Sequence, residues 1–290
     1  MNAMQTVTVG AGSVQKVQFG QNLPLSLIAG TCAIESRETT LKTAAHMVNV
    51  CQKLGIGLIY KGSFDKANRT SAGGKRGLGL EEGLKVLAEV RALEGLPVLT
   101  DVHETIQVQS VYEVADMAQI PAFLARQTDL LLACGREAAK YDGKGVNIKK
   151  GQFMAPADMG PASAKIAECG IDNILLTERG TTFGYGDLVV DMRGLPTMAA
   201  TGYPVVFDVT HSIMQPSGKG DSSTGKREFA APLARAAVAT GIQGLFIETH
   251  PDPSCAISDK DTQLPLESME AFLYPLVELH KRLQDLSQAA

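Results

Sequence analysis

The chain alternates short apolar runs with longer amphipathic stretches along most of its length. The apolar runs are nearly continuous, which is typical of strands buried on both faces of a parallel sheet. Such strands are expected at Leu25–Ala29, Gly57–Tyr60, Pro97–Thr100, Met117–Ile120, Val146–Ile148, Ile174–Leu176, Val205–Phe207 and Leu245–Ile247. Each run is followed by a stretch with helical periodicity, such as the one that Ser36 can cap and that extends to about Leu54.

Eight strand–helix units in 290 residues predict an α/β protein with a closed (β/α)8 barrel, the TIM barrel. We expect one domain over residues 1–290. A doubly wound sheet is the alternative, but no G-x-G-x-x-G segment opens the first helix. Thr6–Val9 and Val14–Phe19 alternate around glycines, which predicts a β-hairpin within an N-terminal extension of residues 1–24.

Composition limits the classes of partner. The formal net charge is −4 and no broad basic stretch occurs, so a nucleic-acid partner is not expected. No membrane association is expected either, because no apolar run approaches the roughly 20 residues of a membrane-spanning helix. The five cysteines are scattered and include no C-x-x-C pair. That pattern is typical of a reducing cytoplasm rather than of a disulfide framework.

Polar residues follow successive strands, and in a barrel those strand ends meet at one face. The segment KGSFDKANRTS at Lys61–Ser71 is the richest of them. Cations and hydroxyls on a rigid strand end suit a phosphate-binding turn, whereas a solvated surface turn is the alternative. Strand alternation turns Lys149 inward, where it either binds an anion or pairs with an acid. The cations at the expected rim are Lys61, Lys66, Arg69, Lys149 and Arg179.

A second group of strand-end residues could hold a metal. Closure of the barrel would bring together a thiol, an imidazole and two carboxylates, from Cys32, His211, Glu248 and Asp259. One sulfur, one nitrogen and oxygen ligands suit a borderline divalent ion such as Zn²⁺, Fe²⁺ or Mn²⁺. Spacing alone favours the simpler interpretation that Cys32 is a small core residue.

These motifs resemble those of the 3-deoxy-D-manno-octulosonate 8-phosphate synthases. The resemblance extends from about Ile28 to the C-terminal helix. It is carried by IAGTCAIES, KGSFDKANR, TDVHE, QIPAFLARQTDLL, VNIKKGQF, TERGTTFGY, FDVTHS, FIETHPDP and SDKDTQLPL. The K-A-N-R element separates this group from the related 3-deoxy-arabino-heptulosonate 7-phosphate synthases, which carry a K-P-R-T-like element.

The resemblance implies condensation of phosphoenolpyruvate with arabinose 5-phosphate, in the cytoplasm and in lipopolysaccharide (Kdo) biosynthesis. It implies these phosphoenolpyruvate-binding residues: Lys61, Ser63, Lys66, Gln119, Lys149, Arg179 and His211. It implies these arabinose 5-phosphate-binding residues: Asn68, Arg69, Thr70, Asp101 and Arg126, the last from a neighbouring subunit of a homotetramer. The catalytic residues are then expected to be Lys61, Asn68, Asp101 and His211.

The resemblance also changes the interpretation of Cys32. The metal-independent branch of the family carries Asn at this position, so Cys32, His211, Glu248 and Asp259 match the metal-dependent branch. The implied metal could orient the aldehyde or lower the pKa of a bound water, and the sequence does not choose. Two other hypotheses remain: a synthase that uses erythrose 4-phosphate, against which Asn68 argues, and a non-catalytic barrel that binds a phosphorylated ligand.

Overall fold

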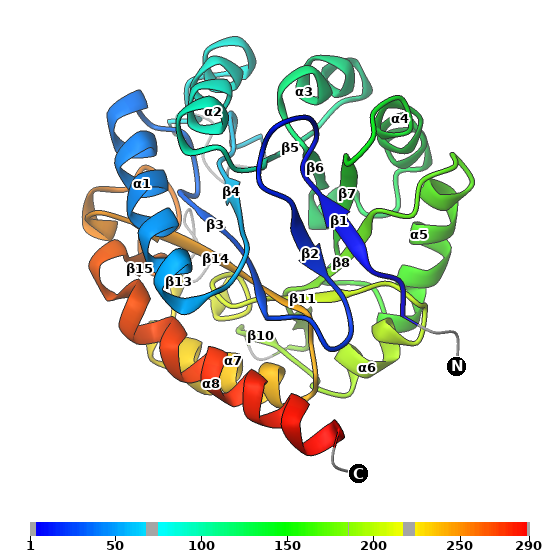
Figure 1. Ribbon diagram of the computed structural model, residues 1–290, viewed down its shortest axis with the longest axis vertical. Helices are drawn as coiled ribbons and strands as arrows, with labels where there is room; N and C mark the ends of the chain where they lie inside the picture. The colour runs from blue at the N-terminus through cyan, green and yellow to red at the C-terminus, as the bar shows by residue number, and fades with distance from the viewer. Residues whose placement is uncertain (1–3, 68–74, 185, 217–223, 289–290) are drawn as a thin grey trace.

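A computed structural model of the chain describes residues 4–67, 75–184, 186–216 and 224–288. Within these residues, eight parallel strands form a closed barrel, because the last of them, β14, pairs with both β11 and β3. Figure 1 looks down the barrel axis. The barrel strands are β3 (Ser26–Gly30), β4 (Leu58–Lys61), β5 (Val98–Asp101), β6 (Met117–Ile120), β7 (Gly145–Lys149), β8 (Ile174–Glu178), β11 (Val205–Asp208) and β14 (Gly244–His250).

Helices surround the barrel as an outer ring (Figure 1). They are α1 (Arg37–Leu54), α2 (Leu80–Glu94), α3 (Val108–Val114), α4 (Thr128–Ala138), α5 (Met159–Ala167), α6 (Gly194–Ala199), α7 (Ala230–Ala239) and α8 (Met269–Gln288). Short 3₁₀ helices precede several of them: η1 (Thr105–Gln107), η2 (Ala122–Leu124), η3 (Pro156–Asp158), η4 (Arg227–Phe229), η5 (Pro253–Cys255) and η6 (Leu266–Ser268). The predicted cap is present, since Ser36 Oγ accepts a hydrogen bond from Thr39 N. No helix in the described part of the chain has the length and apolarity needed to cross a bilayer.

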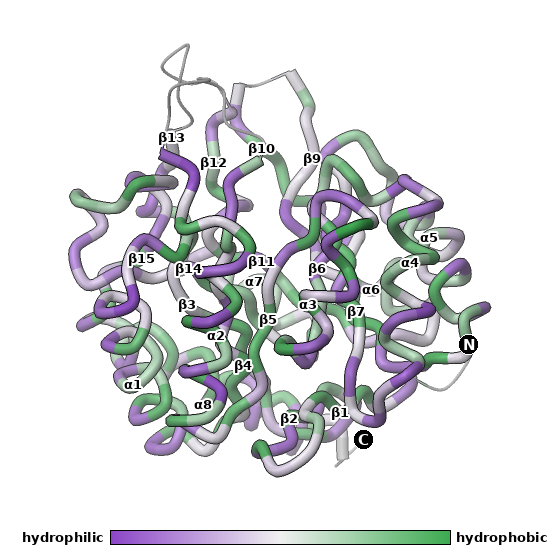
Figure 2. The backbone as a smooth tube through the Cα atoms, turned by 90° about the horizontal axis from the view of Figure 1, so that it is seen from above, coloured by the Kyte–Doolittle hydropathy of each residue, from purple (hydrophilic) through white to green (hydrophobic). Residues whose placement is uncertain are grey.

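The N-terminal hairpin, β1 (Val7–Val9) and β2 (Val17–Phe19), covers the end of the barrel where the strands begin (Figure 2). Val7, Val9, Val17 and Phe19 pack with inward-facing barrel residues in one apolar cluster that reaches up to Phe246. Backbone hydrogen bonds tie the hairpin to segments that precede the strands, including Gly10 N to Gly143 O. Apolar side chains of the hairpin and the barrel therefore fill the end of the barrel where the strands begin.

The barrel and the hairpin that the sequence predicts are both confirmed, with boundaries that differ by a few residues. The second hairpin strand begins at Val17 rather than Val14, because the chain first turns through Gly12. The small strand pairs beyond the barrel were not predicted from the sequence. These are β9 (Thr181–Thr182) with β10 (Leu188–Val189), β12 (Met214–Gln215) with β13 (Thr224–Gly225), and β15 (Leu264–Pro265) alongside β14. They lie at the end opposite the hairpin (Figure 2).

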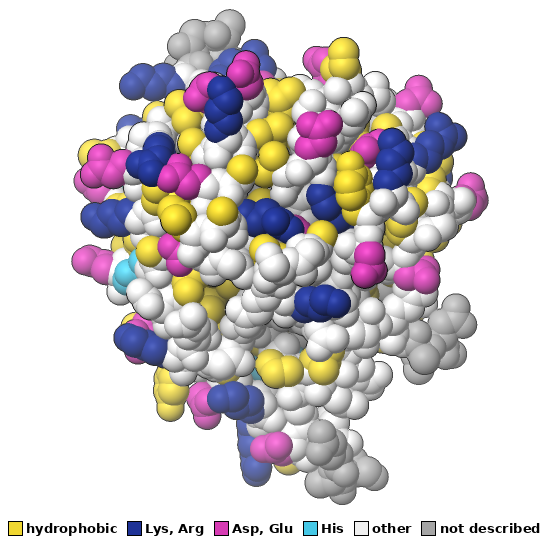
Figure 3. All heavy atoms as spheres, turned by 45° about the horizontal axis from the view of Figure 1, so that its top comes forward, with side chains coloured by type: hydrophobic (Ala, Val, Ile, Leu, Met, Phe, Trp, Pro, Cys, Tyr) yellow, Lys and Arg dark blue, Asp and Glu magenta, His cyan; other side chains and the backbone are white. Residues whose placement is uncertain are grey.

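Charges are mixed over the face of the molecule that Figure 3 shows, where lysines and arginines lie among acidic and apolar side chains. This distribution agrees with the small net charge of −4. The unusual concentration of charge is inside the barrel, at the end where the strands finish.

Candidate functional site at the carboxyl ends of the strands

Charged and polar side chains from four strands share the carboxyl end of the barrel. Lys61, Gln119, Lys149 and Arg179 are at most 6% exposed. Each lies at or next to the end of its strand, and closure of the barrel brings these ends to one rim. Burying cations is costly unless they have anionic or hydrogen-bonding partners, so the partners of each one define the site.

Lys61 ends β4 and is buried against β3 and β14. Its Nζ lies 2.5 Å from Glu248 Oε1 and 2.8 Å from the Cys32 carbonyl oxygen. The close approach of the β3 and β4 backbones here needs Gly30, because a Cβ there would lie 1.9 Å from the Lys61 carbonyl oxygen. The alternative that Lys61–Ser71 is a solvated surface turn is wrong for its first residues, since Lys61 and Ser63 are each 1% exposed. Residues 68–71 lie outside the described residues.

Lys149 points into the barrel, as the alternation of β7 predicted. Its Nζ lies 2.6 Å from Asp208 Oδ2 and 3.7 Å from the centre of the Phe246 ring. Burial lowers the pKa of Lys149, although the charges of Asp208 and Glu248 oppose that effect. Lys149 therefore pairs with an acid, as one interpretation held, although it does so inside the barrel. That it also binds an anion stays a prediction.

Asp208 links Lys149 to His211. His211 Nδ1 lies 2.8 Å from Asp208 Oδ2, and Asp208 Oδ1 accepts a hydrogen bond from His211 N. Burial alone would raise the pKa of Asp208, but His211 and Lys149 outweigh it and hold that pKa below its usual range. Asp208 was not selected from the sequence. Its signal was available, because it ends a strand three residues before His211.

A second acidic centre lies on β5. Asp101 accepts a hydrogen bond from Ser63 and lies 3.0 Å from His103 Nε2. Lys66 Nζ donates to Ser63 Oγ at 3.0 Å. Burial would raise the pKa of Asp101, but His103 and Lys66 hold it well below its ordinary value. Asp101 is therefore an anion that faces the same rim as the lysines.

Lys66 is a further cation beside these acidic groups. Burial alone would lower its pKa, but the acidic groups around it, Cys32 first and then Glu248 and Asp101, raise it overall. Gln119 continues the lining, since its Oε1 accepts a hydrogen bond from Asn147 Nδ2 at 3.0 Å. Arg179 Nη2 contacts Met214 Sδ at 3.2 Å, and its buried Nε has no partner among the described residues.

Four residues predicted to bind the sugar phosphate remain. Asn68, Arg69 and Thr70 lie outside the described residues. Arg126 is exposed between η2 and α4. Of the residues predicted to bind the sugar phosphate, the structure therefore describes two: Asp101 inside the barrel and Arg126 on its outer rim.

Three of the four expected metal ligands are close together. Ligand atoms of Cys32, Glu248 and Asp259 all lie within 4.8 Å of one another, the one such cluster found in the described part of the chain. Cys32 Sγ donates to Asp259 Oδ2 at 2.8 Å. His211 is adjacent rather than part of the cluster, with its Nε2 3.7 Å from Glu248 Oε2.

This cluster fits a divalent ion. Glu248 Oε2 is buried and has no hydrogen-bond partner among the described residues, because Lys61 takes the other oxygen. Burial raises the pKa of Cys32, and the charges of Asp259 and Glu248 raise it further. A cation between these groups would offset both carboxylates and favour the thiolate, and sulfur with oxygen ligands suits a borderline metal.

The model of the DAHP synthetase I family matches residues 5–285 of this chain. Curated relatives align over almost their whole length. A protein of Rhodopseudomonas palustris (strain BisB5) named "2-dehydro-3-deoxyphosphooctonate aldolase" is 56% identical over 271 residues, 93% of this chain and 92% of the relative. Proteins with the same name from Bradyrhizobium diazoefficiens and Syntrophotalea carbinolica are each 53% identical, and cover 95% and 92% of this chain and 95% and 94% of themselves.

Proposed function

This chain belongs to the DAHP synthetase I family, and from that premise we infer that it is an enzyme with the activity of its curated relatives. It condenses phosphoenolpyruvate with D-arabinose 5-phosphate and water. The products are 3-deoxy-D-manno-octulosonate 8-phosphate, a precursor in lipopolysaccharide synthesis, and inorganic phosphate. The observation that carries this inference is the group of buried cations at one rim, beside a cluster of metal-ligand type.

The residues proposed to hold phosphoenolpyruvate are Lys61, Ser63, Lys66, Gln119, Lys149, Arg179 and His211. Two features support this assignment. The cations come from separate strands, so they can approach one phosphate and one carboxylate from several sides. The unpartnered Nε of Arg179 also leaves a buried donor that an anion would satisfy.

The sugar phosphate is proposed to meet Asn68, Arg69, Thr70 and Asp101, with Arg126 supplied by a neighbouring subunit. Asp101 supports this, because an ionised carboxylate with ordered partners can accept hydrogen bonds from sugar hydroxyls.

The proposed chemistry needs no covalent enzyme intermediate. Carbon 3 of phosphoenolpyruvate attacks the aldehyde carbon of the sugar, and water adds to the positive charge that develops at carbon 2. The resulting hemiketal phosphate then loses inorganic phosphate by cleavage of its C–O bond. Lys61, Lys149 and Arg179 would offset the charge of the phosphate and carboxylate, while Asn68, Asp101 and His211 would orient the reacting groups.

We propose that a divalent metal would be held by Cys32, Glu248 and Asp259, with His211, whose Nε2 lies 3.7 Å from Glu248 Oε2, as the fourth ligand. Zn²⁺, Fe²⁺ and Mn²⁺ all fit this donor set. When bound, such an ion supplies Lewis-acid polarisation to an oxygen in the site. The buried, unpartnered Glu248 Oε2 is the feature that supports it.

We propose that the chain forms a homotetramer, and four apolar side chains on neighbouring loops support an interface between subunits. Ile106, Phe123, Phe153 and Phe183 follow β5, β6, β7 and β8 and are between 50% and 81% exposed. Exposed large side chains on adjoining loops are typical of an interface between subunits, and Arg126 lies three residues after Phe123. We further propose that residues 1–290 act as one domain in the cytoplasm, which the five free cysteines support.

The test is release of inorganic phosphate when both substrates are mixed with the enzyme and a divalent metal. Phosphate released in proportion to arabinose 5-phosphate is expected. Faster release with erythrose 4-phosphate would instead support the related synthase activity. No release with either sugar would favour the non-catalytic barrel.

A further inference from the structure

Two charged residues at the rim point away from the barrel interior and into its wall. Lys150 follows β7 directly, and Glu178 is the last residue of β8. Strand alternation turns them to the side opposite Lys149 and Arg179, the residues next to them in sequence. Their side chains are 0% and 4% exposed, and their Nζ and Oε1 atoms lie 3.4 Å apart.

Lys150 also binds the loops that leave both strands. Its Nζ lies 3.2 Å from the carbonyl oxygen of Gly151 and 3.3 Å from that of Met154, both after β7. On the β8 side it lies 3.5 Å from the carbonyl oxygen of Gly180 and 3.1 Å from Thr181 Oγ1. One ammonium group therefore connects two loops that are about 30 residues apart in the chain.

Glu178 completes the arrangement. Its Oε1 accepts a hydrogen bond from Gly180 N at 2.6 Å, which bends the chain around Arg179. Gly180 has a φ of +96°, a conformation that glycine adopts without strain. Arg179 therefore lies between two residues that are both held in place. Glu178 pairs with Lys150, and Gly180 contacts Lys150 through its carbonyl oxygen and Glu178 through its amide.

We propose that Lys150 and Glu178 are a positioning pair that fixes the separation of Lys149 and Arg179. The inference rests on the proposed function, in which those two cations bind phosphoenolpyruvate. The pair does not touch the substrate. It couples the ends of β7 and β8, so that two cations that repel one another stay at the spacing that one phosphate and one carboxylate require.

The chain supplies a matched control on the same strand. Lys144 precedes β7 as Lys150 follows it, and it is also buried, with 6% exposure. Its ammonium donates to the Tyr112 carbonyl oxygen and lies 4.4 Å from the centre of the Tyr141 ring. Lys144→Met and Lys150→Met therefore remove the same group from opposite ends of β7.

The experiment measures the Kd of phosphoenolpyruvate by calorimetry, KM for both substrates, and Tm. Lys150→Met is expected to raise the Kd and KM of phosphoenolpyruvate on the order of 10- to 100-fold, with the KM of arabinose 5-phosphate changed far less. Lys144→Met is expected to lower Tm and leave both constants within about twofold. A Lys150→Met enzyme with a lower Tm and unchanged phosphoenolpyruvate binding would overturn the proposal.

Glu178→Gln keeps the size of the side chain and an acceptor for Gly180 N, but it removes the charge that faces Lys150. It replaces Lys150→Met in these measurements if that variant does not fold. The double variant Lys150→Met/Glu178→Gln leaves no unpaired buried charge and is expected to regain Tm but not phosphoenolpyruvate affinity. Recovery of wild-type affinity would contradict a positioning role. Arg179→Ala is the reference: if it leaves phosphoenolpyruvate binding unchanged, the proposed binding site is wrong and the pair's role falls with it.

Discussion

The two ends of the barrel use the same strands for opposite purposes. At the end where the strands begin, Phe19 and the hairpin valines pack on barrel side chains in an apolar cluster. At the end where they finish, Lys61, Lys149 and Glu248 are just as deeply buried but charged. Phe246 separates the two layers, since it belongs to the apolar cluster while Lys149 Nζ lies 3.7 Å above its ring.

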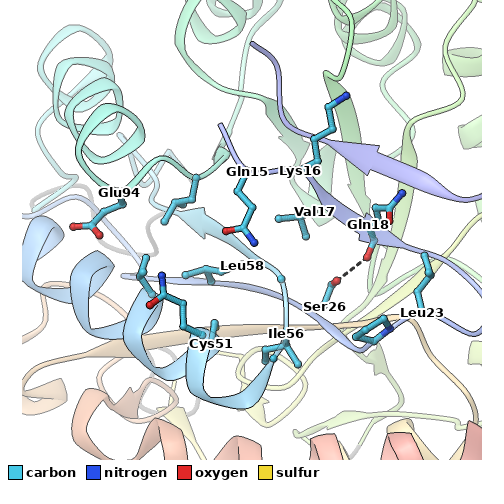
Figure 4. A pocket seen from close by; sticks show the side chains of 16 residues that line it. Gln15, Lys16, Val17, Gln18, Leu23, Ser26, Cys51, Ile56, Leu58 and Glu94 are labelled. Carbon is cyan, nitrogen blue, oxygen red and sulfur yellow. Dashed lines mark hydrogen bonds between the residues drawn. The ribbon is translucent and has the colours of Figure 1, made fainter. Parts of the chain in front are cut away.

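A cavity of about 440 Å³ emphasises the contrast (Figure 4). It lies between the hairpin, the end of α1 and the start of β4, and is lined by Gln15, Val17, Cys51, Ile56 and Leu58 among others. Burial raises the pKa of Cys51 to about 12, so its thiol stays neutral. Lys16 is the one cation among the described residues that line this hollow, so the hollow lacks the convergent cations that an anionic substrate needs. Burial of charge, rather than the size of a cavity, identifies the site.

The largest effect on stability is expected at the apolar end. Phe19 is fully buried against the start of β14, where a Cβ on Gly244 would lie 2.7 Å from its ring. Phe19→Ala should lower the free energy of unfolding by about 3–5 kcal/mol and leave kcat/KM of the folded enzyme unchanged. Denaturant unfolding and steady-state kinetics measure both. Leu93→Ala is the control, because Leu93 is 65% exposed and its loss should change stability by about 0.5 kcal/mol or less.

The largest effect on activity is expected at the charged end. Lys149→Met removes a cation proposed to bind phosphoenolpyruvate, so kcat/KM should fall on the order of 10²–10³-fold. Asp208 keeps His211 as a partner, which limits the loss of stability. Equal losses of activity in Lys149→Met and Lys144→Met would contradict the claim that only the charged end of the barrel takes part in catalysis.

Removing the proposed metal should lower activity through the charged end of the barrel alone, where the candidate cluster lies. A strong chelator is expected to lower activity at least 10-fold, and restored activity should follow addition of Mn²⁺ or Zn²⁺. Cys32→Asn should alter that dependence, because it replaces the buried thiol of the cluster. Full activity after exhaustive chelation, with metal content verified by elemental analysis, would contradict the metal assignment.

The smallest of these predicted effects on stability is expected for Ser36, which lies at the charged end of the barrel but has a structural role alone. Ser36 caps α1 through Thr39 N, so Ser36→Ala should cost about 0.5–2 kcal/mol of stability and leave kinetics unchanged. Thermal unfolding and KM for both substrates test it. A changed KM would mean that the contrast between the two ends depends on nearness to the rim rather than on burial of charge.

Much of this arrangement could be predicted because strands and their ends have simple patterns. Continuous apolar runs located the eight barrel strands, and alternation turned Lys149 inward. The pairing of Lys61 with Glu248 could not be predicted, since it joins residues 187 positions apart and depends on closure of the barrel. The conformation of Asp259 was also hidden, because its φ of +52° is set by a loop without regular pattern.

Lys150 illustrates the limit most clearly. The sequence shows two adjacent lysines, and alternation turns Lys149 into the barrel interior and Lys150 into its wall. Nothing in the local sequence identifies Glu178 as the partner of Lys150, because that contact needs the register of β7 against β8.

The most direct test is a crystal structure of the Mn²⁺-loaded enzyme with phosphoenolpyruvate, with the metal located by its anomalous scattering. The account predicts one metal peak between Cys32, Glu248 and Asp259, and the phosphate of phosphoenolpyruvate beside Lys149 and Arg179 at the same rim. A metal bound elsewhere, or phosphoenolpyruvate bound in the cavity beneath the hairpin, would contradict it.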